Sequence, residues 1–234
     1  MGSRQPPVQQ PPPVQRVRLR YAKRGPARFT SHRDVSRALE RALRRAGVPM
    51  AYSSGFTPHP RISYGGASPT GAASEAEYLE LGLASEVSLP RLVAALNEVL
   101  PQGIVMLDAA PATKVPLGEL LQVSDWQIAL DQVDPMRLAA AVAGLLAADS
   151  YQVERTTRKG QRSFDVRAAI LALQPVTDGL ELRLLHQTPL VRPDDVLTAL
   201  QRLDPQLPRL ATALLRRTNQ GRLDPSGDIE DPLR

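Results

Sequence analysis

The sequence predicts an α+β fold made of two tandem halves, each with the strand–helix–strand–strand–helix–strand order of a ferredoxin-like (split βαβ) unit. Two observations predict it. Segments in which apolar residues alternate with polar ones are interspersed with segments in which they recur every three or four residues. The resulting order of elements then occurs twice, on either side of a Pro- and Gly-containing linker at residues 111–123. A chain of 234 residues is long enough for two small domains.

The first half, residues 16–110, begins with a predicted strand at 15–22. Val17, Leu19 and Tyr21 alternate there with arginines, which predicts a half-buried strand with a basic outer face. The other elements of this half are predicted as a helix at 32–46, strands at 48–52, 75–83 and 104–109, and a helix at 90–100.

The helix at 32–46 carries a basic stripe. Ser31, followed three residues later by Asp34, fits a capping box and predicts where the helix begins. The apolar residues share one face, and a separate face carries arginines at i, i+4 spacing, namely Arg33, Arg37, Arg41 and Arg45. Like charges at this spacing repel by roughly 0.2–0.5 kcal/mol per pair, a cost that a bound polyanion would remove.

Residues 53–74 form a loop rich in Ser, Gly, Pro and Thr. Prolines stiffen a loop and glycines widen its conformational range, so this composition favours a shaped loop. It carries His59 between two prolines, with Phe56, Arg61 and Tyr64 close by. Tyr52, just before the loop, is expected in the core.

The second half, residues 124–219, repeats the element order. Its elements are predicted as strands at 125–130, 151–157, 180–187 and 209–217 and helices at 135–147 and 193–203, with 164–173 compatible with either a helix or a strand. The Pro/Gln-rich residues 1–15 are expected to be disordered and residues 220–234 to form a loose tail.

Composition excludes several classes of protein. The chain has no cysteine, so disulfides, zinc–thiolate sites and cysteine-held iron–sulfur clusters are excluded. Its three histidines make a dedicated transition-metal site an unfavourable interpretation, and we expect no metal and no cofactor. No apolar run reaches the roughly 18–20 residues of a membrane span, and the first residues lack the apolar core of a signal peptide. We therefore expect a cytoplasmic protein.

Positive charge is concentrated in one stretch. Between Arg16 and Tyr64 there are twelve Lys and Arg residues against two acidic ones. The planar guanidinium group suits phosphate and stacks on bases, so this bias favours RNA as a partner. A solvated basic surface is the alternative. The predicted nucleic-acid-binding residues are Arg28, Arg33, Arg37, Arg41, Arg45, Phe56, His59, Arg61 and Tyr64.

Three of the side chains in this region are candidates for catalysis. Histidine is a common general acid or base in enzymes, which makes His59 and His32 candidates. A ribonuclease could combine His59 with Tyr64 and with Arg61 as a charge stabiliser, or pair His32 with His59. A capping role for His32 and a loop-stiffening role for His59 are the structural alternatives. Arg155, Arg158, Lys159 and Arg162 form a second basic group, predicted at a hairpin tip, which would either extend an RNA path or be a solvated turn.

Within residues 28–82, the segments SHRD, RALRRAG, YSSGFTPHPRIS and SEAEYLEL occur in an order and spacing that resembles the bacterial radical-SAM-associated domain of unknown function. A weaker resemblance continues to LVRPDDVL at 190–197. The chain corresponds to the stand-alone form of that domain, without the radical SAM cysteine motif. The resemblance therefore implies association with a radical SAM protein or with RNA processing, and it supplies no mechanism.

We consequently expect an RNA-binding adaptor that presents RNA to a radical SAM or RNA-processing enzyme and is not itself an enzyme. Two alternatives stay open: a metal-independent endoribonuclease that uses the loop histidines, and a protein-docking module that makes no contact with RNA. Salt dependence of RNA binding and cleavage in the presence of EDTA would separate them.

Overall fold

The computed structural model describes residues 9–157, 160–207 and 212–234. These residues form a mixed α+β fold with mostly antiparallel strand pairing, and they divide into two compact units. The first unit comprises residues up to Thr70, Ala76–Glu119 and the last two residues, and the second comprises Gly71–Glu75 and Leu120–Pro232. In the described ranges, the helices are too short or too polar to cross a membrane.

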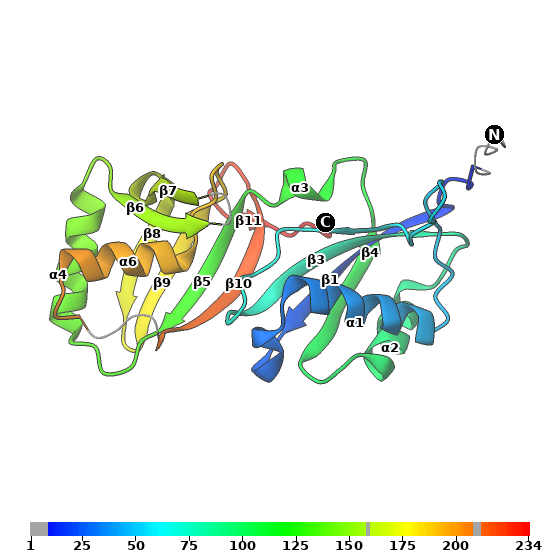
Figure 1. The fold of residues 1–234 in the computed structure, drawn as a ribbon, viewed down its shortest axis with the longest axis horizontal. Helices are drawn as coiled ribbons and strands as arrows, with labels where there is room; N and C mark the ends of the chain where they lie inside the picture. Colours follow the sequence, from blue (N-terminus) through cyan, green and yellow to red (C-terminus); the bar gives the residue numbers. More distant parts are fainter. Residues whose placement is uncertain (1–8, 158–159, 208–211) are drawn as a thin grey trace. The chain divides into compact units, whose positions relative to one another are not determined.

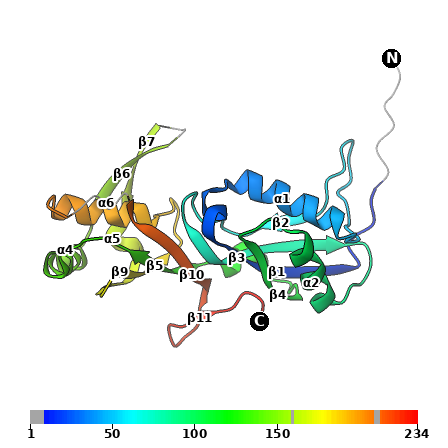
Figure 2. The ribbon, with the colours of Figure 1, turned by 90° about the horizontal axis from the view of Figure 1, so that it is seen from below.

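The first unit carries two helices on one face of an antiparallel sheet (Figures 1 and 2). In chain order its elements are β1 (Gln15–Lys23), a 3₁₀ turn (Gly25–Phe29), α1 (His32–Arg45), β2 (Ile62–Tyr64), β3 (Ala73–Leu83), α2 (Leu89–Val99) and β4 (Ile104–Pro111). The strand order is β4-β1-β3, and β2 pairs with the other side of β3. The short helix α3 (Leu117–Leu120) follows.

The core of the first unit follows the predicted alternation. Val17 and Leu19 on β1, and Leu79 and Leu81 on β3, are buried against apolar residues of α1 and α2. The expectation for the opposite face of β1 is wrong, because Arg18 is fully buried rather than solvated. Its side chain bonds Glu80 and the Val115 carbonyl, groups that are distant in sequence.

The predicted strand at 48–52 is also wrong. Met50 and Tyr52 form only isolated bridges, to Leu83 and Pro60 respectively. The ladder on β3 is made instead by β2, from the segment predicted as loop. Pro49 interrupts the earlier segment and lacks the N–H group that a continuous ladder requires.

The second unit has the sheet order β10-β5-β9-β8, with antiparallel pairing between these strands. Its elements are β5 (Val123–Ala129), α4 (Pro135–Ala147), β6 (Gln152–Thr157), β7 (Gly160–Asp165), α5 (Val166–Ala169), β8 (Ile170–Val176), β9 (Gly179–Leu185), α6 (Pro193–Leu203), β10 (Leu214–Leu223) and β11 (Ile229–Glu230). Ala73 and Ser74 belong to this unit and pair in parallel with Arg216 and Arg217.

A hairpin departs from the predicted repeat of elements. β6 pairs with β7 as a separate two-stranded sheet, which Figure 2 shows projecting from the α6 side of the unit. The segment at 164–173, which suited either a helix or a strand, contains both: α5 and then β8. Val153 and Phe164 anchor the hairpin in the same core as α4 and α6.

The segments expected to be loose differ from prediction where the structure describes them. Val14 donates a backbone hydrogen bond to Leu83, and Gln10 donates one to the Ser54 hydroxyl. The linker contains α3. The expected tail begins inside β10 and includes β11, which pairs with β10 through residues such as Leu223.

Candidate nucleic-acid interface

Helix α1 begins as its sequence predicts. The Ser31 hydroxyl accepts a hydrogen bond from the Asp34 backbone N–H at 3.2 Å and donates to its carboxylate at 2.7 Å. Such a cap satisfies backbone donors that a helix start otherwise leaves unpaired. Val35 and Leu39 are among the residues that bury the opposite face, so the position of the helix on the sheet is fixed.

The arginines of α1 form an exposed ridge on this fixed helix. It consists of Arg33, Arg37, Arg41, Arg44 and Arg45. Within the described ranges none of the five is ion-paired with a carboxylate. No ion pair among the described residues therefore offsets their mutual repulsion, and they are available to phosphate groups.

Aromatic side chains lie exposed in the segments that flank α1. Phe29 is 62% exposed, and the Arg28 guanidinium lies 4.6 Å from the centre of its ring. Phe56 is 69% exposed. Tyr52 is 43% exposed, so its expected place in the core is wrong. Phe29 was missed from sequence because it adjoins a helix start, where aromatic residues commonly pack.

His32 and Tyr64 are brought together. Their rings meet edge-to-face, with centroids 5.2 Å apart and planes at 86°. The Tyr64 hydroxyl donates a long hydrogen bond, 3.5 Å, to the Ser36 carbonyl. Burial raises the pKa of Tyr64 to about 12, although the hydrogen bond to Ser36 opposes this shift. A phenol with such a pKa is a poor proton donor near pH 7, so this contact favours packing over acid catalysis.

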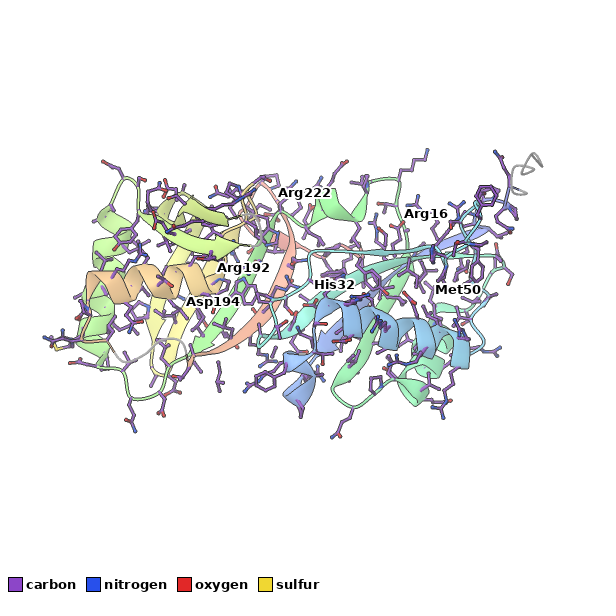
Figure 3. All side chains as sticks on the ribbon, in the orientation of Figure 1. Arg16, His32, Met50, Arg192, Asp194 and Arg222 are labelled. Carbon is purple, nitrogen blue, oxygen red and sulfur yellow. The ribbon has the colours of Figure 1, made fainter. Side chains whose placement is uncertain are left out.

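His59 lies elsewhere in the first unit. Its backbone exchanges hydrogen bonds with Ser53, and Arg61 is held by the Tyr52 carbonyl. On β3, Tyr64 pairs with Leu79, whereas Arg61 accepts a backbone hydrogen bond from Gly82. Gly82 is three residues further along the strand than Leu79. Three strand residues span about 10 Å, and His59 precedes Arg61 by two residues in the chain. Figure 3 likewise separates His32, where α1 begins, from Met50 and Arg16 toward the other end of the helix.

One member of the second basic group, Arg155, is held by contacts within the second unit. Arg155 is ion-paired with the buried carboxylate of Asp195 and lies 4.2 Å from the ring centre of Phe164, so it supports α6 instead of facing an RNA. Its partner is forty residues away, so no local pattern in the sequence indicates this ion pair. Arg162 is exposed on β7, and Arg158 and Lys159 lie outside the described residues.

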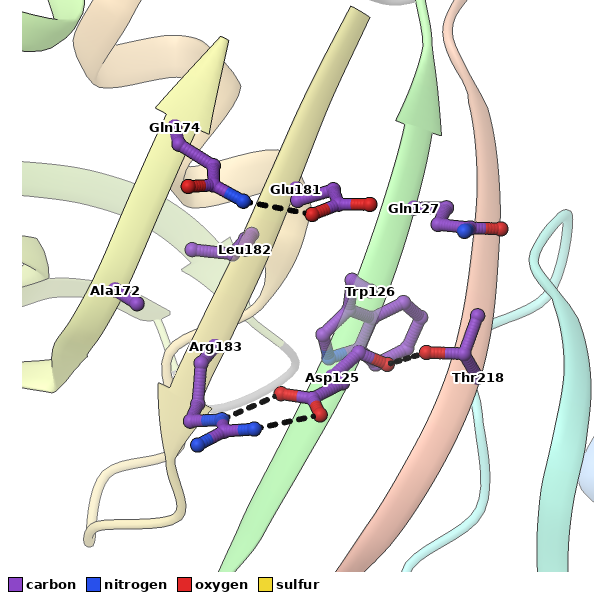
Figure 4. Close-up of a pocket in the computed structure, with 9 residues that line it drawn as sticks. All are labelled: Asp125, Trp126, Gln127, Ala172, Gln174, Glu181, Leu182, Arg183 and Thr218. Atoms are coloured by element: carbon purple, nitrogen blue, oxygen red, sulfur yellow. Dashed lines mark hydrogen bonds and ion pairs between the residues drawn. The ribbon is translucent and has the colours of Figure 1, made fainter. Parts of the chain in front are cut away.

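A hollow of about 380 Å³ lies on the sheet of the second unit (Figure 4). Four of its polar side chains already bond one another in two pairs. Arg183 donates two hydrogen bonds to Asp125, at 2.7 and 3.0 Å, and Gln174 donates one to Glu181 at 2.7 Å. The hollow is therefore better explained as a satisfied sheet surface than as a ligand site.

The third histidine, His186, was not singled out from sequence. Its Nδ1 lies 2.7 Å from the Leu121 carbonyl, which can only accept, and its Nε2 lies 2.8 Å from the Ser124 hydroxyl. The Trp126 indole N–H donates to the same hydroxyl. The imidazole therefore completes a partly buried network, and its position directly after an alternating strand was the only sequence signal.

These features describe a two-unit α+β protein with an exposed arginine ridge that has no carboxylate partner in the part of the chain that the structure describes. Residues 16–194 match the family described as "Uncharacterized protein conserved in bacteria (DUF2344)", and the chain belongs to that family. The match begins in β1 and ends within α6. No curated protein matches the chain.

Proposed function

We propose that the protein is an RNA-binding adaptor that presents RNA to a radical SAM or RNA-processing enzyme. The observation that carries the proposal is the ridge on α1: five exposed arginines on a helix whose other face is buried, without carboxylate partners among the described residues. Helix α1 carries these five arginines against two acidic residues, Asp34 and Glu40, and a phosphate backbone would neutralise its excess positive charge.

The flanking aromatic residues support RNA in particular. Phe29 and Phe56 present exposed rings on either side of the ridge in sequence. Unstacked bases of single-stranded RNA bind aromatic rings, and arginines track the backbone beside them. The resemblance of residues 28–82 to a radical-SAM-associated domain supports an enzyme partner of that class.

We also propose that each unit is a ferredoxin-like half. The sheet orders β4-β1-β3-β2 and β10-β5-β9-β8 each match the order of a split βαβ unit when the β6–β7 hairpin and α5 are treated as an insertion. In each unit two helices pack into the same core.

The decisive experiment reverses charge on the ridge. Arg37→Glu with Arg41→Glu should abolish binding to cellular RNA and leave the thermal unfolding temperature close to that of the parent. The control, Lys114→Glu with Arg202→Glu, changes net charge by the same amount at exposed positions that are not part of α1 and should retain binding. Equal binding by both double variants would remove the ridge from the proposal.

Purification at low salt separates this proposal from its alternatives. Co-purifying RNA is the expected result, and its sequence would identify the substrate. A protein that arrives free of RNA but bound to another polypeptide would favour the docking module. RNA cleavage that survives EDTA and disappears in His59→Ala would favour the ribonuclease.

A further inference from the structure

A small basic pocket lies on the first unit, on the face of the sheet opposite α1 and α2. Its volume is about 370 Å³, and its lining residues are Pro13, Arg16, Arg61, Ile62, Ser63, Glu80 and Gly82. Glu80 and Gly82 alternate along β3 with the leucines that pack against the helices, which places the pocket on the helix-free face. The ridge and the pocket are therefore separate sites.

Arg16 is held in place at one side of the pocket. Its Nε and Nη2 both donate to Oε1 of Glu80, and the other carboxylate oxygen accepts from the buried Arg18 at 3.2 Å. One carboxylate thus serves two arginines. The remaining amino group of Arg16, Nη1, keeps its hydrogen-bond donors for another acceptor.

Arg61 and Ser63 supply unused donors at the other side. Arg61 Nε donates to the Tyr52 carbonyl at 3.0 Å, which orients the guanidinium. Within the described part of the chain, the two terminal amino groups of Arg61 and the Ser63 hydroxyl have no hydrogen-bond partner. A pre-oriented arginine loses less conformational entropy when it binds an anion.

Gly82 lines the pocket without contributing a side chain. A Cβ atom built there would lie 2.8 Å from Pro13 Cγ and 3.1 Å from Arg61 Cβ. Glycine therefore allows the N-terminal segment and Arg61 to approach each other across the strand. Any larger residue would displace one wall of the pocket.

The geometry points to a site for a phosphate monoester, such as the terminal phosphate of a nucleotide or of an RNA end. Three donor groups, from Arg16, Arg61 and Ser63, match the three terminal oxygens of a monoester. The pocket has two arginines against one carboxylate that is already shared with Arg18, so it favours a dianion. The guanidinium fork fits phosphate oxygens.

Titration of the full chain with adenosine 5′-monophosphate, inorganic phosphate and adenosine tests the site by NMR without using RNA. We expect the first two to shift the resonances of Arg61, Ser63 and Gly82, and adenosine to leave them unchanged. Arg61→Ala and Gly82→Ala should each weaken nucleotide binding at least tenfold. The ridge variant Arg37→Glu/Arg41→Glu should bind the nucleotide as the parent does.

Binding of adenosine equal to that of the nucleotide, shifts confined to α1, or unchanged affinity in both folded pocket variants would overturn the inference. RNAs with a 5′-phosphate, a 3′-phosphate or hydroxyl ends then distinguish the source. Preference for a phosphorylated end identifies an RNA terminus. Nucleotide binding without that preference identifies a free nucleotide, and either result supports the site. Only the comparison of RNA ends rests on the proposed function. If the protein does not bind RNA, the nucleotide titration still decides whether the pocket binds a phosphate monoester.

Discussion

The guanidinium of Arg155 on the β6–β7 hairpin is ion-paired with the carboxylate of Asp195 in the first turn of α6. The carboxylate side chain is 4% exposed and also accepts the Arg192 backbone N–H at 2.8 Å. A charge buried to this extent depends on its partners. This relationship joins the hairpin to the helix and has direct consequences for stability.

Asp195→Asn should destabilise the second unit by about 3 kcal/mol, because it leaves Arg155 without its carboxylate and weakens the helix cap. Urea unfolding followed by the fluorescence of Trp126, the single tryptophan, measures this loss. The neighbouring Asp194 is exposed and provides the control. Asp194→Asn should change stability by less than about 0.5 kcal/mol, and equal losses in the two variants would contradict the assigned role of the ion pair.

Acidification should destabilise the second unit through His186. Burial lowers the pKa of His186; the hydrogen bond with Leu121 opposes this shift, and the charge of Arg217 adds to it. Folding therefore favours the neutral imidazole. Its stabilising contribution is complete above the unfolded pKa of about 6.5 and is lost as pH falls through the lower folded value.

Unfolding at pH 8 and at pH 5 checks this prediction. His186→Gln should reduce the difference in stability between the two pH values, whereas His59→Gln, at an exposed histidine, should preserve it. A pH dependence that is unchanged in His186→Gln would assign the effect to other groups.

RNA binding should become less sensitive to salt when the ridge is neutralised. Arg37→Ala with Arg41→Ala should lower the slope of log K against log salt by about 1.4, the value for two lost contacts to a single strand. Fluorescence anisotropy with a labelled single-stranded RNA at several salt concentrations measures the slope. Lys114→Ala with Arg202→Ala should leave it unchanged, and an equal decrease there would indicate only a general charge effect.

Tyr64→Phe should preserve both RNA binding and stability. The ring that meets His32 remains, and among the described residues the hydroxyl makes only the 3.5 Å hydrogen bond to the Ser36 carbonyl. The melting temperature and RNA affinity of this variant test the assignment of Tyr64 as a packing residue. A large loss of RNA binding without loss of stability would show instead that the hydroxyl contacts the ligand.

Sequence patterns that span only a few residues predicted helix bounds and a helix cap. The helix at 135–147 was predicted with the bounds of α4, and Ser31 caps α1 as expected. Four of the five exposed arginines of α1 were also predicted, because helical periodicity alone separates them from the buried face; Arg44 was not among them. These predictions depended on contacts within a few residues.

Long-range contacts account for the errors. The burial of Arg18 depends on Glu80 and Val115, and the role of Arg155 depends on Asp195. No spacing rule in the sequence links these residues. The pocket beside Arg61 was missed for the same reason, since its walls come from three separate strands and the N-terminal segment.

The short parallel pairing of Ala73 and Ser74 with β10 has a consequence for how the chain can be divided. Residues 71–75 supply a strand segment and the fully buried Ala72 to the second unit, although they precede the rest of it by more than forty positions. A C-terminal fragment that begins at residue 120 would lack them. During synthesis on the ribosome, this segment emerges long before its partner β10, so the second unit can be completed only when almost the whole chain has been translated.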